Sequence, residues 1–173
     1  TFIEALVERD VFNVLKYNLV SKGYTYRKLF WLTGILAFFI SPVADNLTTA
    51  LILSTVLLTI DRNNTNFLVA GAINIVVAAN AGGAWSPFGD ITTLMVWAAG
   101  KSPFLDFFAL FPASFIGWFV TAFLLSRIVP NTAPHFDVAN EPKVVMKKGG
   151  KAVIFIGAFT IFCAVMMHQL FHL

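Results

Sequence analysis

The chain contains the stretch SPVADNLTT at residues 41–49, and the pattern returns as SPFGDITT at residues 86–93. In both stretches Ser-Pro and two further residues precede an aspartate, Asp45 or Asp90, and a pair of threonines follows. Each stretch interrupts a longer apolar segment. Proline and glycine break helices, and broken backbone within a bilayer is tolerated only where protein or a water-filled cavity surrounds it. Two matched breaks in one short chain therefore predict a functional site.

The composition supports a membrane environment. Of the 173 residues, 58% are hydrophobic and 12% are charged, with a mean hydropathy of +0.78, whereas a soluble domain carries about 25% charged residues. The net charge is +3, but the basic residues flank apolar segments and form no patch with interleaved aromatics, which argues against nucleic acid as a partner. We predict an all-α membrane protein, with the lipid bilayer as its solvent.

The apolar pattern predicts a series of membrane elements. Because the chain starts at Thr1 without an initiator Met and stops at Leu173 inside an apolar segment, we expect part of one transport domain of a larger protein. The predicted order is an amphipathic helix at 1–23, a re-entrant hairpin at 28–60, a broken transmembrane helix at 67–100, a continuous transmembrane helix at 104–129 with Ser102 as its N-cap, a cytoplasmic loop at 130–151 and a further transmembrane helix at 152–173.

The segment from residue 29 to residue 60 allows two topologies, a crossing with a break or a hairpin. Its arms, Leu29–Ile40 and Leu47–Ile60, measure about 18 and 21 Å, short of the ~30 Å hydrocarbon core. With a hairpin here and a single crossing at 67–100, eleven of the twelve Lys and Arg lie on one side and only Lys101 on the other. If the segment from residue 29 to residue 60 crosses the membrane, the Lys and Arg divide six to six, and if both broken segments are hairpins they divide seven to five. The positive-inside rule therefore favours a hairpin that enters from the cytoplasm.

The two breaks are rich in oxygen ligands. Each proline lacks an N–H, which frees the carbonyls of Phe38 and Gly83 if the preceding arms are helical. Carboxylate, amide and hydroxyl oxygens add to these and suit hard cations such as Na⁺ or Li⁺, or hard divalent ions. Softer metals would bring His or Cys, and neither break contains one. The breaks thus predict a site for a hard cation.

Each aspartate also has a purely structural interpretation as a helix N-cap, because Asp45 or Asn46 precedes Leu47 and Asp90 precedes Ile91. A carboxylate inside the membrane, however, costs about 2.5–3.5 kcal/mol on insertion scales. We therefore favour binding of cations and protons, with which capping can coexist. Competition of Na⁺ and H⁺ for one set of carboxylates is enough for exchange, provided that the site alternates between the two sides.

The sequence resembles the NhaD-type sodium/proton antiporters of the ion transporter superfamily. The resemblance is carried by FFISPVADNLTTAL at 38–51 and NAGGAWSPFGDITTLMVW at 80–97, and it covers essentially the whole chain, which would be under half of a family member. It implies that Asp45, Asn46, Asp90 and Thr92 contact Na⁺. The full set that it ties to Na⁺ or Li⁺ and proton exchange is Ser41, Asp45, Asn46, Asn80, Asp90, Thr92 and Thr93.

The resemblance also implies the wider architecture and role. We expect one part of an inverted-repeat fold, elevator-like alternating access, a homodimer in the bacterial inner membrane, sodium efflux at alkaline pH, and no cofactor beyond the transported ions. A sodium-coupled carboxylate symporter or an arsenite-type transporter of the same superfamily is the main alternative, although such symporters have Ser-Asn-Thr tips without paired Asp. An intramembrane aspartyl protease would need Tyr-Asp and Gly-x-Gly-Asp, whereas Ala44 precedes Asp45 and Pro87-Phe88-Gly89 precedes Asp90. We therefore expect a transporter and not an enzyme.

Overall fold

The structure is a computed structural model. It describes residues 8–10, 14, 23–61, 63–133, 147, 149–153, 155–157, 159–160 and 163. The chain divides into two compact units, one formed by Lys22–Phe136 and the other by Thr1–Ser21 with Asp137–Leu173. We call them the bundle unit and the terminal unit. All regular secondary structure among the described residues is helical, which confirms the predicted all-α class, while the inverted repeat stays a prediction.

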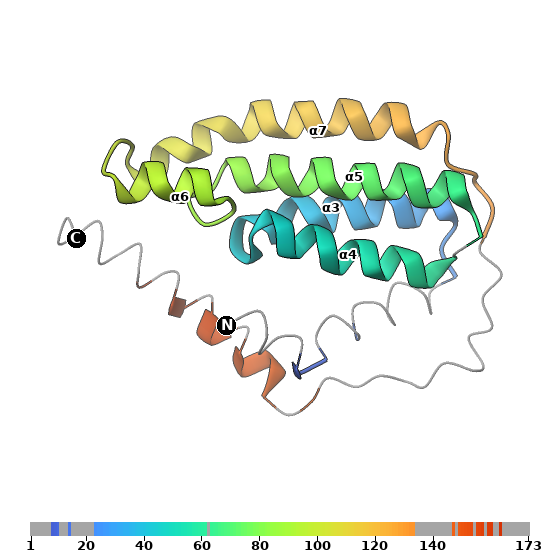
Figure 1. Cartoon of the computed structure of the whole chain (residues 1–173), viewed down its shortest axis with the longest axis horizontal. Coiled ribbons are helices and arrows are strands. Elements are labelled where there is room, and N and C mark those ends of the chain that lie inside the picture. Colours follow the sequence, from blue (N-terminus) through green and yellow to red (C-terminus); the bar gives the residue numbers. More distant parts are fainter. Residues whose placement is uncertain are drawn as a thin grey trace. The chain divides into compact units, whose positions relative to one another are not determined.

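The bundle unit is a set of helices that run back and forth (Figure 1). Helix α4 returns beside α3, α5 reverses direction again, α6 follows α5, and α7 runs back. The end where α3 begins and α7 finishes is called the open end, and the opposite end is called the break end. The elements are α3 Tyr26–Ala44, α4 Asn46–Ile60, α5 Thr65–Ala84, α6 Ile91–Ala98, the 3₁₀ helix η1 Phe104–Leu110 and α7 Phe111–Ser126.

The first break is shorter than predicted, because Asp45 alone separates α3 from α4. Pro42 lies within the last turn of α3, and its carbonyl accepts a hydrogen bond from Ser86 Oγ at 2.9 Å. The proline removes only one donor there, so the helix continues for two more residues. With 19 residues α3 is about 28 Å long, and it is long enough to be a candidate membrane span. The expectation of an 18 Å first arm was therefore wrong.

The two ends of the α3–α4 pair meet at the open end. The hydroxyl of Tyr26 donates a hydrogen bond to Asp61 Oδ2 at 2.5 Å, across 35 positions of sequence. This contact gives the pair the geometry of a helical hairpin. That the hairpin enters and leaves the membrane on one side stays a prediction.

The second break is also shorter than predicted, because α5 continues through Gly82 and Gly83 to Ala84. These glycines allow close approach rather than breaking the helix. A Cβ on Gly82 would collide with the backbone oxygen of Phe38, and one on Gly83 would lie 2.7 Å from the oxygen of Gly89. The carbonyl of Gly83 accepts from Ser86 N at 3.4 Å, so the expectation that it is free was wrong.

The core lies between α3, α5 and α7. Asn74 of α5 is fully buried, donates from Nδ2 to the carbonyl of Phe30 at 2.8 Å and accepts from Trp118 Nε1 at 2.9 Å. The ring of Phe38 stacks on Trp118 with centroids 5.2 Å apart. A buried polar side chain that is bonded through both its nitrogen and its oxygen fixes the relative register of three helices. The breaks at the far end of α3 and α5 are therefore held on a rigid frame.

The segment predicted as one continuous helix from residue 104 to residue 129 has two parts. It begins as the 3₁₀ helix η1 and becomes α-helical at Phe111, next to Pro112, which suits a first helical turn because it has no N–H to donate. Ser102 is not the N-cap, since Pro103 holds that position and Ser102 Oγ contacts Asp106 Oδ2 at 3.3 Å. The α-helix ends at Ser126. Phe104–Ser126 is still a candidate span.

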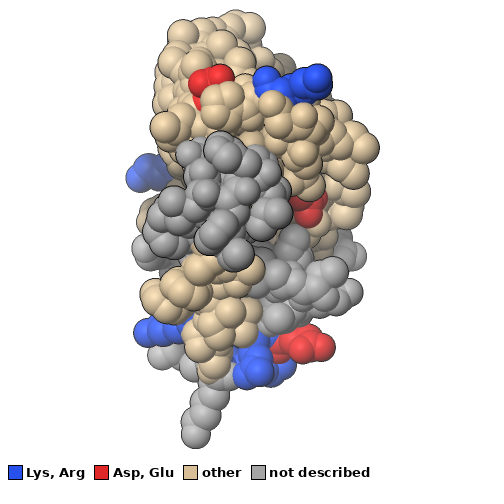
Figure 2. Space-filling model, turned by 90° about the vertical axis from the view of Figure 1, so that its left-hand side faces the viewer, with Lys and Arg blue, Asp and Glu red and all other residues tan. Residues whose placement is uncertain are grey.

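Charge is unevenly distributed along the bundle. Among its described residues, Arg27, Lys28 and Arg127 belong to the helix ends of the open end, whereas Lys101 follows α6 at the break end (Figure 1). The space-filling view shows few charged side chains among many uncharged ones (Figure 2). This distribution agrees with the asymmetry on which the predicted topology rests, and the side of the membrane stays a prediction.

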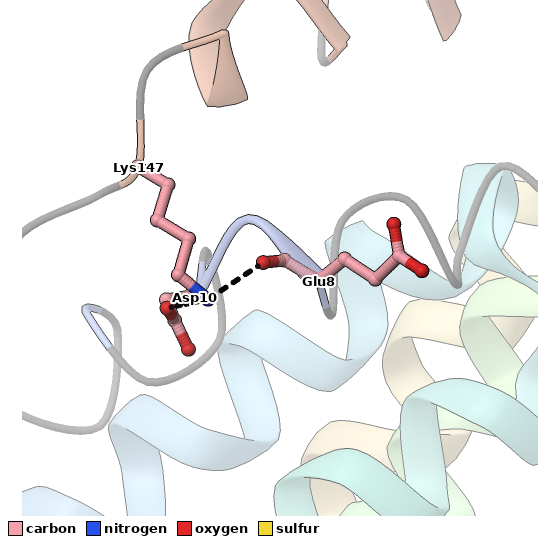
Figure 3. Close-up of polar contacts among 3 residues, drawn as sticks. All are labelled: Glu8, Asp10 and Lys147. Carbon is pink, nitrogen blue, oxygen red and sulfur yellow. Dashed lines mark hydrogen bonds and ion pairs between the residues drawn. The ribbon is translucent and has the colours of Figure 1, made fainter.

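In the terminal unit, Lys147 connects two segments that are far apart in sequence. Its Nζ pairs with Asp10 Oδ2 at 2.8 Å and donates to the backbone oxygen of Glu8 at 3.1 Å (Figure 3). Arg9 and Asp10 form a turn, with Asp10 at φ +58°. The described residues from 150 to 163 are helical. Most of the elements predicted at 1–23, 130–151 and 152–173 lies outside the described residues.

Candidate cation-binding site

Asp45 forms the whole of the first break, with φ +55° and ψ 157°. Residues other than glycine rarely adopt such a backbone conformation, and such strain clusters at functional sites. The backbone N–H of Asn46 donates to the carbonyl of Gly89 at 2.9 Å and so anchors the strained residue to the second break. The carboxylate accepts from Thr48 N at 2.8 Å and from Thr48 Oγ1 at 2.7 Å. Asp45 therefore caps α4, as its structural interpretation predicted.

Asp90 caps α6 in a similar way, but it also reaches across to the other break. Its Oδ1 accepts from the backbone N–H and the hydroxyl of Thr92, at 2.8 and 2.7 Å. Its Oδ2 accepts from Asn46 Nδ2 at 2.6 Å. The two residues lie 44 positions apart in sequence, so this hydrogen bond joins the start of α4 to the start of α6.

Asn46 is the centre of this contact. Besides Asp90, its Nδ2 donates to Asn80 Oδ1 at 3.0 Å, while its Oδ1 accepts from the backbone N–H of Leu47 at 2.8 Å. Asn80 in turn donates from Nδ2 to the carbonyl of Val76 at 2.8 Å, which fixes the orientation of its amide. We call Asn46, Asn80 and Asp90 the cross-break cluster. It collects oxygens from α4, α5 and α6 at one place.

Ser41 and Thr93 hold the backbone of the breaks. Ser41 Oγ, which is fully buried, donates to the carbonyl of Ala79 at 2.6 Å and ties α3 to α5. Thr93 Oγ1 lies 2.9 Å from the carbonyl of Ser86 and 2.8 Å from that of Asp90. Both hydroxyls are thus engaged with backbone in this structure. A direct contact of either one with a cation stays a prediction.

Thr49 was not among the predicted site residues. It is 2% exposed, and its hydroxyl has no hydrogen-bond partner among the described residues. Buried hydroxyls are nearly always bonded, because leaving one unpaired is costly. The sequence did hold a signal for it, since the Thr48-Thr49 pair repeats as Thr92-Thr93. Asn74, the other residue that was missed, gave no signal of this kind because its role depends on Trp118 of another helix.

The chemistry of the site is that of hard oxygen ligands. Asp45 and Asp90 are both partly exposed at the surface of the described chain. Among the described residues no three His, Cys, Asp or Glu side chains lie close enough to hold a metal ion together. Amide, hydroxyl and backbone oxygens would therefore have to complete any coordination shell. A half-turn of the Asn46 amide would present Oδ1 in place of Nδ2 and add one such oxygen beside Asp90.

Comparisons with known proteins agree with this description. The chain is similar to the Na(+)/H(+) antiporter NhaD of Vibrio parahaemolyticus, with 48% identity over 172 residues, which is 99% of this chain and 41% of the relative. Identity to the Na(+)/H(+) antiporter NhaD of Halomonas elongata is 43% over 173 residues, 100% of this chain and 34% of the relative. Identity to sodium/proton antiporter 2 of Arabidopsis thaliana is 40% over 158 residues, 83% of this chain and 37% of the relative. These matches confirm the predicted resemblance to NhaD-type antiporters.

The chain spans well under half the length of these curated relatives. No solved structure matches it significantly. The described residues include three helices that are long and apolar enough to cross a membrane, which together with these relatives supports an integral membrane protein. The family model described as citrate transporter, CitMHS, matches residues 1–173. The chain therefore belongs to the CitMHS citrate transporter family.

Proposed function

We propose that the full-length protein is a secondary transporter that exchanges Na⁺ or Li⁺ for protons and moves the cation out of the cell by alternating access. The observation that carries this proposal is the hydrogen bond between Asn46 Nδ2 and Asp90 Oδ2, which joins the two breaks. The names of the relatives at 40–48% identity, all Na⁺/H⁺ antiporters, support it further.

The proposed ligands of the cation are Asp45, Asn46, Asp90 and Thr92, with Asn80 beside them. Thr92 fixes one oxygen of Asp90, so that the other faces the cross-break cluster. When a cation enters, its charge replaces the N–H of Asn46 as the partner of Asp90 Oδ2. When a proton enters, the carboxylate becomes neutral and the cation leaves. Exchange follows because one set of oxygens holds either the cation or the proton.

The setting of this activity belongs to the same proposal. The full-length protein is a multi-pass protein of the bacterial inner membrane and a homodimer, with no cofactor beyond the transported ions. The α3–α4 hairpin enters the membrane from the cytoplasm and forms, with the broken helix α5–α6, part of one inverted repeat. The positions of Arg27, Lys28 and Arg127 at the open end support this orientation.

The test uses the full-length protein in proteoliposomes, with a pH-sensitive dye inside and Na⁺ added outside. We expect Asp45→Asn and Asp90→Asn to abolish proton movement driven by Na⁺ or Li⁺. Asp61→Asn is the matched control, because Asp61 is a carboxylate at the open end that accepts from Tyr26 and lies outside the cross-break cluster, and it should retain exchange. Exchange at the wild-type rate in both Asp45→Asn and Asp90→Asn would refute the site.

A second candidate is sodium-coupled uptake of a carboxylate such as citrate, and the description of the matching family favours it. The two activities separate in the same proteoliposomes. An antiporter moves protons when Na⁺ is added without any carboxylate, and a Na⁺ gradient does not accumulate labelled citrate. Citrate accumulation that needs Na⁺, without proton movement in the absence of citrate, would replace the proposed exchange by symport.

A further inference from the structure

A groove at the open end of the bundle lies at the start of α3, away from the breaks. Its volume is about 410 Å³, and the residues that line it are Tyr24, Arg27, Lys28, Trp31, Leu32, Ile35 and Asn131. Two of these side chains are cationic, and none is acidic. The groove therefore offers positive charge together with apolar surface.

The lining residues change character in a regular order along α3. Arg27 and Lys28 lie in its first turn, Trp31 lies one turn further, and Leu32 and Ile35 follow. At 1.5 Å per residue Ile35 is about 12 Å beyond Arg27 along the helix axis. Cations, then an indole ring, then aliphatic side chains are the order in which protein groups meet the headgroup, the interface and the hydrocarbon of a bilayer. A molecule that has an anionic headgroup, an interfacial region and an aliphatic chain in this order fits the groove.

Arg27 has an unused hydrogen-bond donor. Its Nη2 donates to the carbonyl of Val129 at 3.1 Å, while its Nε is buried and has no partner among the described residues. A buried donor on a charged group is costly when unpaired. The planar guanidinium suits phosphate oxygens, which can accept two parallel hydrogen bonds from it. Lys28 is exposed beside it, with Nζ 6.0 Å from the ring centroid of Tyr24, and supplies a second charge.

We propose that this groove binds an anionic phospholipid of the surrounding membrane. Its phosphate lies between Arg27, Lys28 and the amide of Asn131, and one acyl chain lies along Trp31, Leu32 and Ile35. Basic pockets beside membrane helices bind anionic headgroups by this combination of charge and apolar contact. The lipid phosphate accepts from the Arg27 guanidinium, whose Nη2 keeps its hydrogen bond to the carbonyl of Val129. It also stabilises the junction between the start of α3 and Val129, which follows α7.

The experiment measures lipid binding to the purified full-length protein by native mass spectrometry, with phosphatidylglycerol and, separately, phosphatidylcholine. Wild type should retain one phosphatidylglycerol in preference to phosphatidylcholine. Lys28→Gln and Arg27→Gln should each weaken phosphatidylglycerol binding about fivefold. Arg127→Gln is the matched control, because Arg127 is a cation of the same end whose guanidinium lies 4.7 Å from the ring centroid of Phe123, outside the groove. It should stay within about twofold of wild type.

The variants also distinguish a site from general attraction and from a misfolded protein. Lys28 is exposed and Lys28→Gln should leave the melting temperature without lipid unchanged, so its loss of binding cannot be caused by unfolding. Equal losses in Lys28→Gln and Arg127→Gln, or equal binding of the two lipids, would overturn the proposal. If another part of the full-length protein covers the groove, neither Arg27→Gln nor Lys28→Gln would change lipid binding, and that result would overturn it too.

Discussion

The two breaks share the pattern Ser-Pro-x-x-Asp, yet they have different structures. The first consists of Asp45 alone, whereas the second extends from Trp85 to Asp90. Both aspartates cap the helix that follows. The described hydrogen bonds of the Asp45 side chain go to Thr48, three residues away, while the carboxylate of Asp90 also binds Asn46 of the other break. The same motif therefore specifies the cap in both places, and the neighbouring element determines which carboxylate connects the two breaks.

The difference also shows which break depends on the other. The longer second break contacts the end of α3 and the start of α4, since Ser86 Oγ donates to the carbonyl of Pro42 and the carbonyl of Gly89 accepts from the N–H of Asn46. These two contacts hold the strained backbone of Asp45 in place. Strain of this kind persists only where the surroundings over-determine the conformation. The first break is therefore shaped by the second.

The largest effect is expected where α3 and α5 bring the breaks together. Gly82→Ala would place a Cβ against the backbone oxygen of Phe38, which cannot move as a flexible side chain can. We expect the free energy of unfolding of the full-length protein in detergent, measured by denaturant titration, to fall by about 1–3 kcal/mol. The second break would then no longer support Asp45, and exchange activity should fall with it.

Gly117→Ala is the matched control, because Gly117 is also in a helix but a Cβ there meets no heavy atom within 4 Å. It should be neutral or stabilise by about 0.5–1 kcal/mol, since alanine favours a helix over glycine. Equal stability of Gly82→Ala and Gly117→Ala would show that the close approach of α5 to Phe38 is not needed. The dependence of the first break on the second would then be wrong.

A double-mutant cycle tests the connection between the breaks directly. Asn46→Ala and Asp90→Ala each remove one partner of the 2.6 Å hydrogen bond, so their effects on the free energy of unfolding should be non-additive by about 1–2 kcal/mol. The same cycle with Asp45→Ala and Asp90→Ala is the comparison. The structure gives no direct bond between these two side chains among the described contacts, so their coupling should be smaller than that of Asn46 and Asp90.

The opposite pattern, with coupling between Asp45 and Asp90 and none between Asn46 and Asp90, would contradict the cross-break cluster. Repeating the cycles with Na⁺ tests whether both carboxylates bind the cation. If a cation bridges the two carboxylates, saturating Na⁺ should increase the coupling between Asp45 and Asp90. A measurement of both cycles with and without Na⁺ therefore separates the geometry of the empty site from that of the occupied one.

Much of this arrangement could be predicted from the sequence, because the signals for it are local. The apolar segments, the two breaks and the caps at Asp45 and Asp90 depend on residues within a few positions of each other. The exact extent of each break could not be predicted. Pro42 and Gly82 look like helix breakers, but the helices continue through both, because Pro42 removes only one backbone donor and Gly82 fits where α5 closely approaches Phe38 of α3. The hydrogen bond from Asn46 to Asp90 is likewise a tertiary contact, and no spacing within the sequence specifies it.

The smallest expected effect on stability concerns Thr49, which lies one residue beyond the threonine that binds Asp45. Thr49→Val keeps the shape of the side chain and removes a buried hydroxyl without a described partner, so the free energy of unfolding should stay within about 0.5 kcal/mol of wild type or rise. If that hydroxyl serves the cation, the apparent KM for Na⁺ should rise about threefold to tenfold with little change in kcat.

Thr55→Val is the control, because Thr55 is in the same helix and its hydroxyl binds the carbonyl of Leu51 on an exposed face. It should leave the apparent KM for Na⁺ unchanged. A loss of more than about 1 kcal/mol in Thr49→Val would mean that the hydroxyl has a structural partner, and an unchanged KM would remove it from the site. A raised KM with wild-type stability would instead make Thr49 a ligand of the cation at the first break. The pairs Thr48-Thr49 and Thr92-Thr93 would then share a function as well as a sequence.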